Sequence, residues 1–178
     1  MKKISLSSLL MFALALTTLS ACGGGGGGGG STPPQSTTAV LTLSSAVTGA
    51  IPAPTVITGY DVTITLPAGV TVKSTTPPQT DASVVVGTIN GAVSGASYSP
   101  ATRKVHIVIV SPNGNGFNAA GEVCKVNCDI APGYHPTATD FQQQPTFKAS
   151  GLNDPNAVKP STVDLTGQLS LTVTAAIN

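Results

Sequence analysis

Residues 59–72 read GYDVTITLPAGVTV, and this stretch decides the fold class. Up to Leu66 an apolar side chain occupies every second position with a polar one between, which is the period of a strand with one buried face. Residues 67–69 interrupt the alternation with the turn-forming sequence Pro-Ala-Gly, and it resumes at Val70. The pattern therefore predicts a strand, a short turn and a second strand.

The same two-residue period continues through most of the chain after residue 38. Its clearest run is residues 163–174, which we expect to form one strand with one solvent-facing side. No window of helical length has apolar residues spaced three and four apart. The apolar faces are Ala39, Leu41 and Leu43; Tyr60, Val62, Ile64 and Leu66; Val105, Ile107 and Ile109; and Val163, Leu165, Leu169, Leu171 and Val173; the expected turns lie at 66–69, 77–78, 90–91, 111–116 and 153–156. We predict an all-β protein with a single β-sandwich, either jelly-roll or immunoglobulin-like.

The composition excludes some classes of partner. Charged residues make up only 8% of the chain, far below the usual quarter. Without Lys2 and Lys3, 6 of the 8 basic residues remain against 7 acidic ones, which gives a formal net charge of −1. The mature chain therefore has no positive electrostatic field that would attract nucleic acid. With no Trp and only 3 Tyr, aromatic platforms for sugars are scarce.

The first residues predict export. Lys2 and Lys3 precede an apolar stretch at 9–16, and small residues follow, which is the order of a secretory signal peptide covering residues 1–21. Thr17, Thr18 and Ser20 break the apolar stretch before it reaches the roughly 20 residues that a membrane-spanning helix needs.

Residues 19–22 read Leu-Ser-Ala-Cys and resemble the lipobox of bacterial lipoproteins. This resemblance implies cleavage before Cys22 and attachment of acyl chains such as palmitate to that cysteine. Two or more chains anchor a protein stably to a membrane. In the same family, a residue other than Asp after the cysteine, here Gly23, favours the outer membrane. The alternative is an ordinary cleaved signal peptide with an accidental cysteine.

A linker follows the cysteine. Residues 23–30 are all glycine, and residues 31–38 contain only Ser, Thr, Pro and Gln. The linker, residues 22–38, therefore has no apolar side chains that could form a core of its own. A Gly-rich coil of this length has a root-mean-square span of roughly 20 to 24 Å. We expect the folded domain to cover residues 39–178.

Two stretches of the domain resemble cohesin-like modules, which are jelly-roll sandwiches related to carbohydrate-binding modules. They are residues 59–72 and residues 115–123, NGFNAAGEV. The resemblance implies docking to a partner protein or a polysaccharide. It carries over no binding residue, because cohesin contacts are spread over a sheet face.

Two cysteines share one predicted strand. If residues 121–130 are extended, Cys124 and Cys128 lie on the same face, four steps or roughly 13 Å apart. A disulfide needs Cα atoms within about 7 Å, so it would require the strand to break between them. The spacing favours two buried free thiols over the bond.

The remaining polar residues predict neither catalysis nor a cofactor. His106 alternates with core residues, and His135 lacks partners at zinc-ligand spacing. The loop at 153–156, Asn-Asp-Pro-Asn, is a candidate site for a structural calcium ion, because calcium binds backbone carbonyl oxygens as well as carboxylates. No nucleophile elbow, pair of catalytic carboxylates or phosphate loop is present in the sequence, and we expect no enzyme activity.

A binding surface is the remaining prediction. Val108 and Val110 lie on the face of strand 105–110 opposite its core residues, and an open face there would mark an interface. The loops 111–121 and 131–145 add Phe117, Tyr134 and Phe141, and interfaces are enriched in aromatic residues. Alternatively, the rings plug the end of the sandwich, and the domain is a structural spacer or accessory subunit of a surface assembly.

Overall fold

A computed structural model describes residues 35–73, 84–86, 93–111, 115–117 and 120–178. The predicted leader, Cys22 and most of the predicted linker lie outside these residues, as do the turns expected at 77–78 and 90–91. Within the described part of the chain, no helix is long and apolar enough to cross a membrane.

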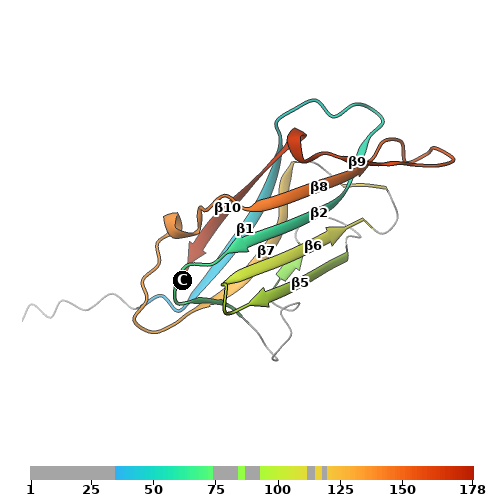
Figure 1. The fold of residues 1–178 in the computed structure, drawn as a ribbon. Helices are drawn as coiled ribbons and strands as arrows, with labels where there is room; N and C mark the ends of the chain where they lie inside the picture. Colours follow the sequence, from blue (N-terminus) through green and yellow to red (C-terminus); the bar gives the residue numbers. More distant parts are fainter. Residues whose placement is uncertain (1–34, 74–83, 87–92, 112–114, 118–119) are drawn as a thin grey trace, which may run out of the picture. The chain divides into compact units, whose positions relative to one another are not determined.

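The described chain forms two antiparallel sheets packed against each other, which confirms the all-β sandwich (Figure 1). One sheet, here the β1 sheet, has the order β10-β1-β7-β3, and β4 also pairs with β7. The other, the β2 sheet, has the order β5-β6-β2-β8-β9. The strands are β1 (Thr38–Val47), β2 (Val56–Thr65), β3 (Val70–Val72), β4 (Val84–Val86), β5 (Val93–Ser99), β6 (Lys104–Val110), β7 (Gly121–Ile130), β8 (Thr146–Leu152), β9 (Thr162–Asp164) and β10 (Leu169–Ile177). The described residues also contain two short 3-10 turns, η2 (Ala138–Phe141) and η3 (Thr166–Gln168).

The core lies between the sheets and contains most residues of the apolar faces that the alternation predicts, together with others such as Phe141 and Ala149. Leu43 of β1, Val62 of β2 and Ile107 of β6 are all completely buried. Tyr60 is the largest fully buried side chain, and its ring stacks on Phe117 with centroids 5.3 Å apart. Burial raises the pKa of the Tyr60 hydroxyl, and the nearby Ser45 of β1 partly offsets that effect. The buried ring of Tyr60 is thus part of the core between the two sheets.

The expected single strand at 163–174 is wrong. β9 ends at Asp164 in the β2 sheet, and β10 begins at Leu169 in the β1 sheet. A turn carries the chain across, because Asp164 Oδ1 accepts the Thr166 N–H at 2.9 Å and the Leu165 carbonyl accepts the Gln168 N–H at 3.0 Å. Leu165 and Leu169 are both buried, four positions apart. This even spacing preserves the two-residue period across the break and hides the turn.

The turn at 66–69 forms where the sequence predicts it. The Val70 N–H donates to the Pro67 carbonyl at 3.3 Å, and Gly69 has a φ of +75°, which suits glycine. The strands that it joins, β2 and β3, belong to different sheets, so this turn is a corner of the sandwich.

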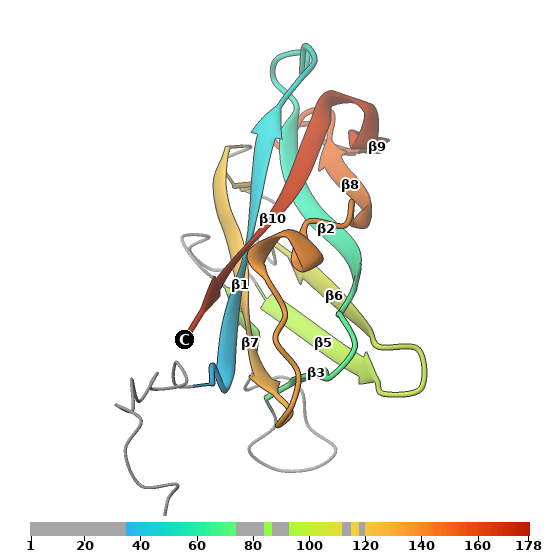
Figure 2. The ribbon, with the colours of Figure 1, turned by 90° about the vertical axis from the view of Figure 1, so that its left-hand side faces the viewer.

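Two residues of the predicted linker belong to the β1 sheet. The N–H groups of Thr37 and Thr38 donate to the Asn178 carbonyl at 2.9 and 3.2 Å, and the Ile130 N–H donates to the Thr37 carbonyl at 2.8 Å. Figure 2 shows the C-terminus beside the start of β1. The ordered sheet therefore starts before Ala39.

A chain that begins at Ala39 is expected to be less stable than one that begins at Gln35. The shorter chain loses several backbone hydrogen bonds, each worth about 1 kcal/mol, so we expect a loss of about 1 to 3 kcal/mol. This corresponds to a fall in Tm of roughly 4 to 10 °C for a domain of this size. Calorimetry of the two chains measures the difference, and equal values of Tm would show that these bonds add no stability.

Candidate functional site

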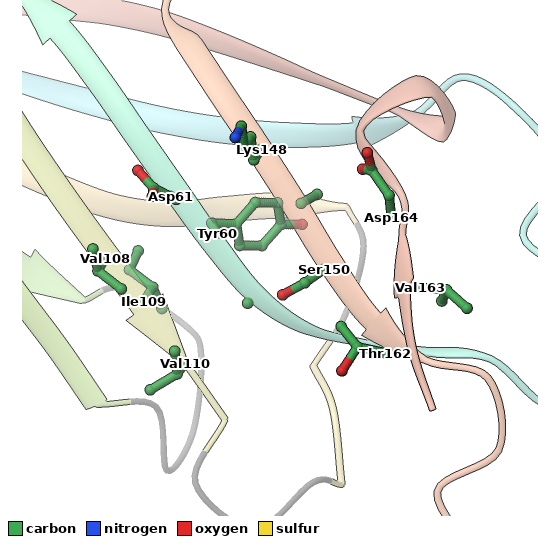
Figure 3. A pocket seen from close by; sticks show the side chains of 12 residues that line it. Tyr60, Asp61, Val108, Ile109, Val110, Lys148, Ser150, Thr162, Val163 and Asp164 are labelled. Atoms are coloured by element: carbon green, nitrogen blue, oxygen red, sulfur yellow. The ribbon is translucent and has the colours of Figure 1, made fainter. Parts of the chain in front are cut away.

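A hollow of about 300 Å³ opens on the outer face of the β2 sheet (Figure 3). Four neighbouring strands, β6, β2, β8 and β9, contribute to its lining. The lining residues are Gly59, Tyr60, Asp61, Val108, Ile109, Val110, Lys148, Ala149, Ser150, Thr162, Val163 and Asp164.

Gly59 creates the hollow. The pairing of β2 with β8 shifts register between Ile57 and Gly59, so the strand carries a bulge beside this glycine. A Cβ atom on Gly59 would lie 2.6 Å from Ser150 Oγ. Glycine in a strand interior often marks such a close approach, and it is the one sequence signal that could have located the hollow.

One wall of the hollow is apolar. Val108 and Val110 project from β6 on the side opposite the buried Val105, Ile107 and Ile109 (Figure 3). Val110 is 42% exposed and Val108 is half-buried. The described part of the chain therefore leaves this face open, as a docking surface requires.

The other walls are polar and charged. Asp61 pairs across the ladder with Lys148, and Ser150 pairs with Asp164 of β9. On the same face, His106 Nε2 lies 2.7 Å from Asp61 Oδ1. Hydrogen bonds from Thr166, together with the nearby Lys148 ammonium, hold the pKa of Asp164 below its ordinary value. The carboxyl groups of Asp61 and Asp164 therefore lie on either side of Lys148 on this surface.

The sequence did not predict Asp61, Lys148, Ser150 or Asp164 as parts of one site. Asp61 lies more than 80 residues before the other three, and Asp164 is on a different strand from Lys148 and Ser150, so only the strand order β2-β8-β9 brings them together. Strand order in an antiparallel sandwich depends on long-range packing, which a single sequence pattern does not encode.

The three predicted aromatic residues do not form one surface. Phe141 is 3% exposed and belongs to the core, so it offers no ring to a partner. Phe117 is half-buried beside Ile57 near the start of β2, whereas the 46% exposed Tyr134 lies over Gly69, beyond the end of β2. The loops that carry them flank opposite ends of the 10-residue β7. We expected these two loops to lie at the same end of the sandwich. That expectation is wrong, because the length of β7, roughly 30 Å, separates them.

Cys124 and Cys128 lie on β7 as free, buried cysteines. Their Cα partners on β1 are Leu43 and Ala39, so apolar neighbours surround them. Burial, with smaller contributions from Glu122 and Asp129, raises the pKa of each thiol to about 12. Neither thiol has the character of a nucleophile or a metal ligand.

The loop at 153–156 uses its side-chain oxygens within the turn. Asn153 Oδ1 accepts the N–H groups of Asp154 and Ser161, and Asp154 Oδ1 accepts the N–H of Asn156 at 2.9 Å. His135 is exposed, and the described residues contain no group of three metal-ligating side chains. A structural calcium ion at this loop has no support from a ligand cluster.

No protein-family model matches this chain, and no curated protein or solved structure matches it. The arrangement of side chains at the hollow is therefore what supports a function.

Proposed function

We propose that the protein is a lipid-anchored, non-catalytic binding module of the bacterial envelope, and that the outer face of its β2 sheet docks another protein. The observation that carries the proposal is the open hollow over Gly59, with Val108 and Val110 on one side and charged residues on the other. An exposed apolar centre with a polar rim is the ordinary composition of a protein docking site.

The lining favours a protein over a glycan. Tyr60 is the one aromatic residue among the lining residues, and it is 2% exposed with its ring in the core. No lining residue therefore offers an aromatic platform to a sugar ring. Asp61 and Asp164 outnumber Lys148, so the best partner surface would place an aliphatic side chain over Gly59 and a basic group beside it.

The predicted anchor fits this role. A lipidated Cys22 would hold the chain at the outer membrane, and the Gly-rich linker would let the domain reach a partner some 20 to 24 Å away. The resemblance of residues 59–72 and 115–123 to cohesin-like modules supports the same class of function, since such modules act by docking.

Val110→Asp is expected to weaken partner capture strongly. The substitution puts a third carboxylate beside Asp61 and removes apolar area from the wall of the hollow, so we expect at least a tenfold weaker interaction. The measurement is a pull-down from envelope extracts, followed by binding of the purified partner to both forms.

Val47→Asp is the matched control, because Val47 is 49% exposed but lies at the end of β1 in the other sheet. Equal capture by wild type and both variants would place the docking site elsewhere. If none of the three captures a protein, the hypothesis of a structural spacer should replace that of a docking module. Saturable binding of an envelope polysaccharide that Val110→Asp weakens would make the ligand a glycan.

A further inference from the structure

Among the residues that the structure describes, the outer edge of β10 presents a row of backbone groups without hydrogen-bond partners. At the two ends of the β1–β10 ladder, Thr38 and Asn178 exchange hydrogen bonds of 3.2 and 2.9 Å, and the Thr48 N–H donates to the Gln168 carbonyl at 2.9 Å. Antiparallel ladders alternate between bonded and non-bonded pairs. The even-numbered residues of β10 therefore bond to β1, and the odd-numbered residues turn their N–H and C=O groups to the other side.

Leu171, Val173 and Ala175 thus direct their backbone groups away from β1. β10 ends the sheet order, and no described residue hydrogen-bonds to these three backbones on that side. Their side chains face the core, where Leu171 and Val173 are buried. Such an edge is complementary to one kind of ligand, an extended polypeptide backbone.

A groove runs along this edge. Residues 142–145, Gln-Gln-Gln-Pro, lie across a hollow of about 280 Å³ from residues 171–174. The turn η2 packs against β10 and leads into this segment, and Figure 2 shows it beside the strand. Among the described residues, the backbone of residues 142–145 makes no hydrogen bond to β10; the Gln142 N–H instead donates to the Thr139 carbonyl at 3.1 Å. The groove thus has a strand edge on one side and glutamine side chains on the other.

We propose that the β10 edge receives an extended, uncharged segment of a partner polypeptide as an additional strand of the β1 sheet. The side chains around the groove, Thr172, Thr174 and the three glutamines, are all uncharged and mostly exposed, which fits an uncharged segment. A second copy of this chain fits less well, because its own residues 142–145 would have to enter the same narrow space. This proposal concerns a different sheet from the docking face and does not depend on it.

The first test uses a labelled peptide with the sequence of residues 38–47, TAVLTLSSAV, which already pairs with the opposite edge of β10 in register. Fluorescence anisotropy measures its binding to the full chain in detergent. Two further peptides carry N-methyl groups on alternate residues, one on the odd set and one on the even set. Because only one set of amides can face β10, we expect one methylated peptide to bind at least tenfold more weakly and the other to bind normally.

Protection of the Leu171 and Val173 amides from hydrogen exchange should accompany peptide binding. Equal effects of the two methylation patterns, or no saturable binding up to about 1 mM peptide, would overturn the proposal. A dimer that forms with rising concentration, without peptide, and that masks the same amides would overturn it too, since the occupant would then be a second copy.

A variant of the protein gives an independent readout. Val173→Pro removes an edge-facing N–H while leaving the bonds to β1 in place, and proline is tolerated on edge strands. We expect it to weaken binding of the unmethylated peptide at least tenfold, whereas Val158→Asp, on a fully exposed loop residue, should have no effect. If Val173→Pro does not fold, the methylated peptides on the wild-type chain decide the question.

Discussion

Replacing Cys22 by alanine is expected to release the protein completely from membranes. In the proposed lipoprotein, this thiol and the new amino terminus carry every acyl chain, so its removal leaves no anchor. Phase partitioning in detergent measures the effect: the wild type should enter the detergent phase and the variant the aqueous phase.

Cys124→Ala and Cys128→Ala are the matched controls. Both cysteines are buried on β7, where no acyl chain could reach them in the folded protein, so both variants should partition like the wild type. A Cys22→Ala chain that still enters the detergent phase would contradict the lipoprotein proposal.

The sandwich is expected to unfold between pH 9 and pH 12, even if its free energy of unfolding at neutral pH is that of a typical domain. Burial raises the pKa of the Cys124 and Cys128 thiols from the ordinary value of 9.0 to about 12. Above pH 9 the unfolded chain loses these protons and the folded chain keeps them, so stability falls as the pH rises. Each thiol costs about 1.4 kcal/mol per pH unit, and the two together cost on the order of 8 kcal/mol by pH 12. That is comparable with the whole stability of a typical domain, about 5 to 15 kcal/mol. The raised pKa of Tyr60 adds to the effect in the same direction.

Circular dichroism at increasing pH measures this transition. The double variant Cys124→Ala, Cys128→Ala should lose stability near neutral pH, because cavities form, but it should show a much weaker pH dependence above pH 9. Wild type and variant with the same pH dependence would contradict the role of the thiols. Mass measurement of the Cys22→Ala chain after alkylation in denaturant supplies the redox control, since two alkylated thiols are expected and a mass two units lower before reduction would indicate a disulfide.

Local sequence patterns were sufficient to predict structure where the two-residue period of a strand acts within a few neighbouring residues. The alternation of Val105, Ile107 and Ile109 predicted the buried face of β6 and placed Val108 and Val110 on the opposite face, which the structure shows to be open among the described residues. The same rule failed at residues 163–174, because two buried leucines four positions apart look alike whether the chain stays extended or turns. No such rule applies to Phe141, because a ring in a polar loop has no period that reveals its burial; the sequence left an exposed ring and a ring that plugs the sandwich both open, and the structure shows the buried one.

The all-β sandwich could be predicted without coordinates, as could the export signal that stays a prediction, because strand periodicity and leader composition are properties of adjacent residues. Which strands are neighbours became known only from the folded chain. That order places Gly59 between Val110 and Ser150, brings Asp61, Lys148 and Asp164 to one face, and leaves β10 at an edge. The physical reason is that strand pairing joins residues far apart in the chain, through backbone bonds that every residue type can make.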